Sequence, residues 1–263
     1  MERARRAGKR RRARLRARRE RGRKMDGEWN PWHGCHKYSA GCANCYVYRR
    51  DASVGRDASR VYRTRDFDLP LRRNRQGGYK LAPGSLVYTC FTSDFLVEEA
   101  DAWRQEAFAM MRQRQDLRFF FITKRIERLG ALLPEDWGPE GYANVEIGCT
   151  CEDQEAVRRR LPEFLHLPIR RRSVICEPLL GPVELEDFLA GGGVAQVVAG
   201  GESGEGARTC DYAWVLSLRD QCARSGVGFH FKQTGARFRK DGRLYAIPRR
   251  HQLSQARKAG IDL

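Results

Sequence analysis

Short, β-rich apolar runs recur at regular intervals along this chain, and most are separated by stretches with the helical spacing of apolar residues. This alternation predicts βα units that feed a parallel sheet. No glycine-rich dinucleotide fingerprint follows the first strand, so we expect a partial (β/α) TIM-like barrel with six or seven parallel strands. The predicted strands span residues 86–91, 118–122, 144–148, 172–176, 195–199 and 228–231, with a first strand just before Cys35. The predicted helices span residues 97–112, 126–133, 154–165, 183–189 and 212–223.

The charge of the chain is unevenly distributed. Of the net charge of +17, residues 1–24 carry +12, from fourteen Lys or Arg and two Glu. We interpret this segment as a basic disordered arm or as a mis-annotated start, with Met25 the true first residue. As an arm it would grip phosphates, address a membrane or organelle, or have no function. Residues 25–240 are the predicted barrel domain, and residues 241–263 a C-terminal tail without a motif.

The composition narrows the class of protein. A chain of 263 residues with 41% hydrophobic residues has enough apolar material for a sizeable core. No apolar run approaches the roughly 20 residues that a bilayer requires. Nine cysteines are an odd number and do not form a secreted disulfide framework, which indicates free thiols in a reducing compartment. We therefore expect a cytoplasmic monomer without a membrane partner.

Three cysteines form the pattern C-x6-C-x2-C within residues 29–46: Cys35, Cys42 and Cys45. Glycines precede two of them and permit close approach of the backbone to a bound group. Three thiolates suit a four-iron cluster or a zinc ion, and either leaves one coordination position for another ligand. The pattern predicts a metal or cluster site. Three more cysteines, Cys90, Cys149 and Cys151, are interpreted as core residues, with a role as hydrogen donor or extra ligand as the alternative.

Polar residues follow almost every predicted strand. Because a parallel barrel gathers the carboxyl ends of its strands on one face, we expect these side chains to line one pocket. Each has an alternative as a helix cap or a turn residue. The residues are Ser93, Asp94, Lys124, Arg125, Glu152, Glu177, Gly200, Gly201, Glu202, Ser203, Gly204 and Lys232.

Taken in order, several of these motifs resemble the phage Gp37/Gp68 family, also called DUF5131, a family of unknown function. The family itself resembles radical S-adenosylmethionine enzymes. The motifs are Trp29-Asn30-Pro31, the three cysteines, Ser93-Asp94, Thr123-Lys124-Arg125, residues 176–182, residues 200–204 and Lys232-Gln233.

The resemblance implies a radical S-adenosylmethionine fold and chemistry. Cys35, Cys42 and Cys45 would hold a [4Fe–4S] cluster, S-adenosyl-L-methionine would fill the open iron, and Tyr46 would take the aromatic position after the last ligand. A reductant such as flavodoxin or ferredoxin would supply the electron that cleaves the cofactor to a 5′-deoxyadenosyl radical, which acts on an unknown substrate. Two features depart from the superfamily: its usual spacing is C-x3-C-x2-C, and its Gly-Gly-Glu segment follows the second strand rather than a late one.

The expected roles follow from this resemblance. Catalytic roles are expected for Asp94, Lys124 and Glu177. Cofactor binding is expected for Ser93, Glu152, Gly200, Gly201, Glu202, Ser203 and Lys232.

A non-catalytic alternative is also open. The three cysteines with His33 or His36 would form a Cys3His zinc site in a nucleic-acid-associated protein. The basic arm would contact phosphate, and Trp29, Trp32, Tyr38 and Tyr46 would stack on bases. The sequence leaves open whether the chain is an enzyme, and it indicates nucleic acid only as a possible partner.

Overall fold

The computed structural model of this chain describes residues 27–263. The predicted basic arm, residues 1–24, falls outside the described residues. Within residues 27–263, no helix combines the length and the apolar character that crossing a bilayer would need.

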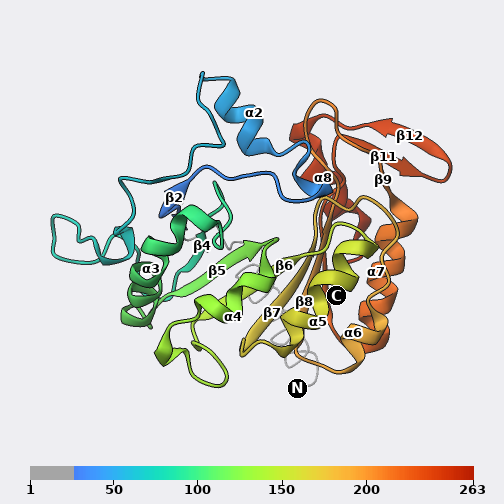
Figure 1. The fold of residues 1–263 in the computed structure, drawn as a ribbon. Coiled ribbons are helices and arrows are strands. Elements are labelled where there is room, and N and C mark those ends of the chain that lie inside the picture. Colours follow the sequence, from blue (N-terminus) through green and yellow to red (C-terminus); the bar gives the residue numbers. More distant parts are fainter. Residues whose placement is uncertain (1–26) are drawn as a thin grey trace, which may run out of the picture.

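A curled sheet of seven parallel strands forms a half-barrel (Figure 1). Neighbouring strands follow the order β1-β4-β5-β6-β7-β8-β10, and every pairing within this sheet is parallel. The predicted parallel, partial barrel is therefore confirmed as an architecture, with the six strands from residue 86 onward within two residues of their expected bounds. The first barrel strand ends at Trp29, earlier than predicted, because the residues just before Cys35 form a separate antiparallel pair. The strands are β1 (Gly27–Trp29), β4 (Leu86–Thr89), β5 (Arg118–Thr123), β6 (Val145–Thr150), β7 (Arg171–Cys176), β8 (Val194–Gly200) and β10 (Gly228–Gln233).

Helices α3 to α7 connect successive strands of this sheet and pack on its outer side (Figure 1). Two begin at an aspartate whose carboxylate accepts a hydrogen bond from a backbone N–H of the first turn: Asp153 before α5 and Asp211 before α7. Helix α7 ends at Gly226, which has the left-handed conformation that terminates many helices. The helices are α2 (Tyr46–Ala52), α3 (Asp101–Gln113), α4 (Leu129–Leu132), α5 (Gln154–His166), α6 (Glu186–Ala190), α7 (Tyr212–Ser225) and α8 (Arg249–Ala259).

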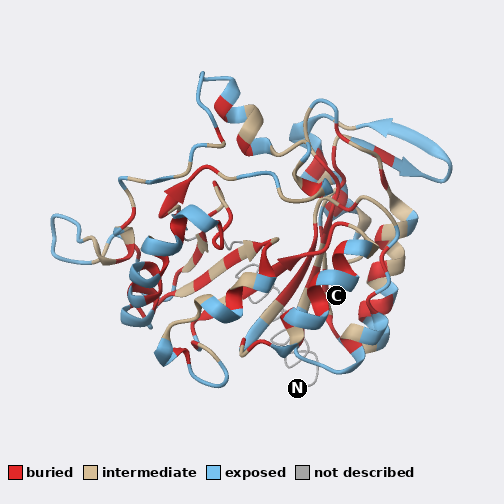
Figure 2. Cartoon of the chain, viewed as in Figure 1, coloured by how far each residue is buried: buried red, intermediate tan, exposed pale blue. Residues whose placement is uncertain are grey.

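Strand β5 illustrates how the sheet separates two environments. Phe119 and Phe121 are fully buried beneath the helices, and Phe121 stacks on Phe95 with ring centroids 4.2 Å apart. Their neighbour Phe120 points the other way and is half-buried on the concave face. Burying a phenylalanine side chain stabilises the folded chain by about 2 kcal/mol. These buried rings belong to the hydrophobic core, which lies between the sheet and the helices. Figure 2 shows this concentration of buried residues along the strands.

Two smaller sheets complete the described chain. Strands β2 (Trp32–His33) and β3 (Tyr62–Arg63) form an antiparallel pair that brackets α2. Strand β11 (Arg237–Lys240) pairs in parallel with β9 (Cys210–Asp211) and antiparallel with β12 (Arg243–Ala246). The segment 241–263, which the sequence analysis treats as a tail, thus contains β12 and α8. Its last residues join the half-barrel, because the Leu263 N–H donates to the Phe229 carbonyl at 3.0 Å.

Candidate functional site

The three motif cysteines lie on one segment, residues 34–45, which we call the cysteine loop. It runs from the end of β2 to the start of α2. Cys35, Cys42 and Cys45 are half-buried free thiols, whereas the other six cysteines of the chain are buried. The buried set includes Cys90, Cys149 and Cys151, in agreement with their interpretation as core residues. The accessible thiols are therefore gathered in the cysteine loop.

The first part of the loop is held by residues that follow β4 and β5. The Ser93 hydroxyl donates to the Gly34 carbonyl. Arg125 donates from Nη1 to Cys35 Sγ at 3.7 Å and from Nη2 to the His36 carbonyl at 3.0 Å. Because these residues follow the carboxyl ends of their strands, the loop crosses the carboxyl end of the half-barrel.

Glu152, which follows β6, holds the middle of the loop. Its Oε1 accepts hydrogen bonds from the Ser39 hydroxyl and from the Gly41 N–H, the latter at 3.3 Å. Its Oε2 accepts from Arg160 Nη1 at 2.6 Å, and both side chains of this ion pair are buried. Burial raises the pKa of Glu152, but the Arg160 guanidinium outweighs it and the pKa lies below its ordinary value. A Cβ at position 41 would lie 3.1 Å from this carboxylate, which explains the glycine.

Glu202, which follows β8, holds the last part of the loop. Its Oε2 accepts from Asn44 Nδ2 at 2.9 Å, and its Oε1 from Arg208 Nη2 at 2.5 Å. Arg208 also donates to the Ala40 carbonyl at 2.9 Å, so this ion pair contacts the loop at two places. Burial raises the pKa of Glu202, but hydrogen bonds from Arg208 and Asn44 leave it below its ordinary value. The carboxylate therefore remains an ionised acceptor at neutral pH.

Glu177, which follows β7, contacts β10 instead of the loop. It accepts from Lys232 Nζ and from Gln233 Nε2, each at 2.7 Å. A Cβ at Gly200 would lie 3.1 Å from the Glu177 carboxylate, and one at Gly201 only 2.2 Å from a backbone carbonyl. The predicted glycine pair thus lets the ends of β7, β8 and β10 approach closely.

Asp94 fixes the turn that follows β5. It accepts from the Thr123 hydroxyl at 2.7 Å and from the Lys124 N–H at 2.9 Å, and it lies 3.4 Å from Arg125 Nη1. These contacts position Arg125 beside the cysteine loop. The Lys124 side chain reaches the loop as well, since a Cβ at Gly41 would lie 3.2 Å from its Cε. Asp94 and Lys124 therefore belong to the surroundings of the loop.

The three thiols share one electrostatic neighbourhood. The Tyr48 hydroxyl donates to the Cys35 carbonyl at 2.5 Å. Burial raises the pKa of Tyr48, and the thiols of Cys35, Cys45 and Cys42 raise it further. Burial, together with the Asp94 carboxylate, raises the pKa of Cys35 to about 12, although Arg125 opposes the shift. A metal that binds Cys35 must displace its proton.

An aromatic surface leads from the last cysteine to the concave face. Tyr46 directly follows Cys45, and its hydroxyl donates to the Phe91 carbonyl. The Phe91 ring contacts the rings of Tyr88 and Phe120, with centroids 5.2 and 6.4 Å apart. We call Tyr46, Tyr88, Phe91 and Phe120 the aromatic surface. Flat rings in this position suit a planar heterocycle.

The donors near the loop are three thiols and two histidines. Both histidines near the loop are bonded to carboxylates: His33 to Asp51 at 2.5 Å, and His36 to Glu99. Within residues 27–263, no three His, Cys, Asp or Glu side chains converge around one metal ion. A zinc ion needs four donors around one atom, whereas a cluster spreads its cysteines over several irons. Each histidine uses one ring nitrogen for its carboxylate, as metal-bound histidines commonly do, so the donors near the loop suit an iron–sulfur cluster or a Cys3His zinc site.

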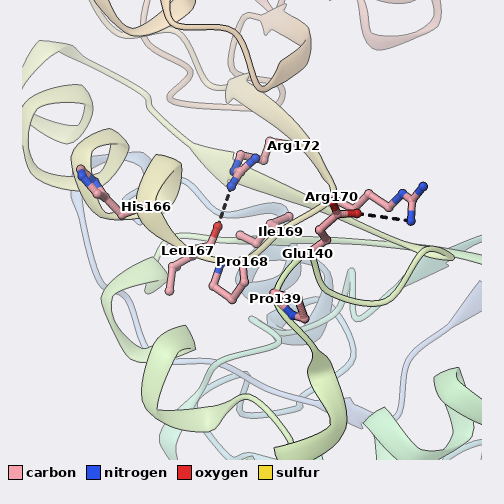
Figure 3. A pocket seen from close by; sticks show the side chains of 8 residues that line it. All are labelled: Pro139, Glu140, His166, Leu167, Pro168, Ile169, Arg170 and Arg172. Carbon is pink, nitrogen blue, oxygen red and sulfur yellow. Dashed lines mark hydrogen bonds and ion pairs between the residues drawn. The ribbon is translucent and has the colours of Figure 1, made fainter.

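A separate surface hollow lies near the amino end of β7. It is lined by Pro139, Glu140, His166, Leu167, Pro168, Ile169, Arg170 and Arg172 (Figure 3). Strand β7 begins at Arg171, so this hollow is at the opposite end of the sheet from the cysteine loop. It contains no predicted site residue.

The chain matches the model of a known protein family. A family model described as "Protein of unknown function (DUF5131)" matches residues 23–260. The chain belongs to the DUF5131 family. No curated protein and no solved structure matches it.

Three residues of this DUF5131 chain complete the site without having been predicted from the sequence. Arg160 and Arg208 pair with the buried glutamates, and Asn44 joins the loop to Glu202. The sequence offered one signal for these partners. Arg160 comes eight residues after Glu152, a spacing of about two helical turns. Arg208 and Asn44 are brought to Glu202 only by the folded loop.

Proposed function

We propose that this protein is an iron–sulfur enzyme of the radical S-adenosylmethionine type. Cys35, Cys42 and Cys45 would hold a [4Fe–4S] cluster, and S-adenosyl-L-methionine would take the remaining iron. The observation that carries the proposal is the cysteine loop itself: three accessible thiols on a segment bonded to the exits of β4, β5, β6 and β8. When bound, the two groups supply one-electron cleavage of a carbon–sulfur bond and removal of a hydrogen atom from a substrate.

Glu152 and Glu202 hold the loop in place for this function. Each has a pKa below the ordinary value, so each remains an acceptor for its loop partner, Ser39 or Asn44, across neutral pH. A loop fixed by buried charge-assisted hydrogen bonds keeps its thiols in one arrangement. The two glutamates are therefore positioning residues in this proposal.

Arg125 acts directly on the thiol side of the site. Its guanidinium donates to Cys35 Sγ, and Asp94 holds it there. Hydrogen bonds and positive charge next to a cluster's sulfur atoms stabilise added negative charge, and so make one-electron reduction easier. This is the chemistry that a reductant such as ferredoxin or flavodoxin would require.

The concave face would bind the organic groups. The aromatic surface suits the adenine ring, because stacking on aromatic side chains is favourable for any nucleobase. At the neighbouring strand ends, the Glu177 carboxylate and the Lys232 ammonium offer partners for an amine and a carboxylate. The Lys232 side chain is half exposed, so this pair can rearrange to accept a ligand.

The test is anaerobic purification and reconstitution of the full chain. We expect about four iron and four sulfide per chain, and 5′-deoxyadenosine after S-adenosyl-L-methionine and dithionite are added. Cys42→Ala should lose iron and product together, whereas Cys222→Ala, at a buried cysteine outside the loop, should retain both.

Two results would overturn the proposal. Zinc in place of iron in the wild-type protein would remove the cluster. If the protein binds an iron–sulfur cluster but never yields 5′-deoxyadenosine, the cluster part of the proposal stands and the S-adenosylmethionine part is wrong.

A further inference from the structure

The described part of the chain carries its excess positive charge on one segment. We call residues 237–258, which comprise β11, β12 and most of α8, the basic patch. It contains eight Arg or Lys residues and one acidic residue, whereas the rest of residues 27–263 contains 28 basic and 29 acidic residues. The remainder is therefore close to neutral. The basic residues of the patch are Arg237, Arg239, Lys240, Arg243, Arg249, Arg250, Arg257 and Lys258.

These eight side chains are exposed, and few of them contribute to folding through ion pairs. Figure 2 shows the exposed hairpin in pale blue. Among the interactions of residues 27–263, only one of the eight has a carboxylate partner: Arg239 lies 3.7 Å from Asp211. Like charges that crowd one surface repel each other. Within the described residues, the folded chain supplies one carboxylate for these eight charges, which leaves the other seven available to an anionic partner.

The geometry favours duplex nucleic acid over a single strand. Alternate residues of a strand share a face, so Arg237 and Arg239 project together from β11, the central strand of the sheet β12-β11-β9. An α-helix fits the major groove of a duplex, and α8 carries four of the eight cations. Single strands are bound mainly by stacking platforms, and Tyr245 is the one exposed aromatic residue of the patch.

The same geometry argues against a lipid surface. An interfacial helix needs a broad apolar face turned outward. In α8 the small residue Ala256 faces the protein, and Leu253 is the one large apolar side chain exposed on the helix. Arg249, Arg250 and Arg257 surround Leu253 on the outer side, as their helical spacing dictates. On β12, Leu244 and Tyr245 are exposed as well, so the patch exposes three large apolar side chains among eight cations, too few for a broad apolar face.

The patch is connected to the cysteine loop through the segment that follows β8. Arg249 donates to the Ser203 hydroxyl oxygen at 3.3 Å, and the Ala236 N–H donates to the Glu202 carbonyl at 2.7 Å. Glu202 in turn holds Asn44 of the loop. Figure 1 shows the hairpin at the same end of the half-barrel as α2.

We propose that the basic patch binds the phosphate backbone of double-stranded nucleic acid and directs it to the carboxyl end of the half-barrel. Phosphate contacts of this kind position a duplex without selecting its sequence. The binding step requires no cluster. Its failure can therefore be distinguished from failure of the proposed iron–sulfur chemistry.

The experiment measures binding of a fluorescent DNA duplex to the full chain by anisotropy over a range of salt concentrations. A patch variant carries Arg237→Gln, Arg243→Gln and Arg250→Gln. A control variant of equal net charge carries Arg75→Gln, Arg158→Gln and Arg170→Gln, at exposed positions outside the patch. Both retain residues 1–24, so the contribution of that segment cancels in the comparison.

We expect the patch variant to bind at least tenfold more weakly, with a slope of log K against log salt that is shallower by about three. The control variant should match the wild type. Equal losses in the two variants would overturn the proposal, because binding would then follow net charge alone. A patch-dependent preference for single-stranded DNA, or for phosphatidylserine vesicles over the duplex, would overturn it as well. Thermal unfolding of both variants confirms that each is folded.

Discussion

The cysteine loop and the basic patch lie at the same end of the half-barrel but differ in how their charges are compensated. Around the loop, Glu152 and Glu202 are buried and each is paired with an arginine. On the patch, eight cations are exposed and only Arg239 is paired within the described residues. The difference teaches that charge at the loop serves the protein's own structure, whereas charge on the patch is available to a partner.

The largest effect should come from separating the buried pair beneath the loop. Glu152→Gln leaves the Arg160 guanidinium buried without a counter-charge, which typically costs about 3–5 kcal/mol. We expect the free energy of unfolding in urea to fall by an amount of this order. Its matched control is Glu186→Gln, which breaks an exposed pair with Arg224 and should leave the unfolding midpoint almost unchanged.

A double variant sharpens this test. Replacing both partners, as Glu152→Leu with Arg160→Leu, removes the two buried charges together and should cost less than Glu152→Gln alone. If the double variant were the less stable of the two, the loss would arise from packing, and the contrast with the patch would no longer rest on charge.

An intermediate effect is expected from pH. The pKa of Glu202 in the folded chain is below its ordinary value of 4.5. Its contribution to stability is therefore complete above pH 4.5 and is lost as the pH falls through the lower, folded value. Chemical unfolding between neutral and acid pH should show a shallower acid loss for Glu202→Gln than for the wild type. Parallel curves would show that this carboxylate does not stabilise the loop.

The smallest effect should come from the patch. Arg243 is exposed and has no carboxylate partner in the described structure, so Arg243→Gln should change the free energy of unfolding by less than about 0.5 kcal/mol. Calorimetry in low and high salt checks this value. A large destabilisation would mean that the patch is part of the structural framework, and the comparison with the loop would fail.

Much of the fold was predictable because it depends on local pattern. In β5, alternation between buried Phe119 and Phe121 and the half-buried Phe120 repeats the period of a strand, and helices follow at their own period. The parallel half-barrel follows from this alternation. The patch was overlooked because residues 241–263 show no motif, and net charge says nothing about which face carries it.

The site was predictable in part. The sequence placed Ser93, Arg125, Glu152 and Glu202 at strand exits, and the structure brings all four to the cysteine loop. Their partners were not predictable, because a hydrogen bond between Asn44 and Glu202 joins residues 158 positions apart in the chain.

The sequence by itself determined a partial barrel of six or seven parallel strands, the resemblance to the family and the three-thiol motif, since each follows from local patterns or from motifs taken in order along the chain. Only the tertiary structure decided that residues at the strand exits form hydrogen bonds with the cysteine loop, and that the cations of the basic patch lie at the same end of the half-barrel. The physical reason is that the role of a charged side chain depends on its surroundings. The side chain stabilises the fold when it is buried against an opposite charge, and it can bind a partner when it is exposed to water.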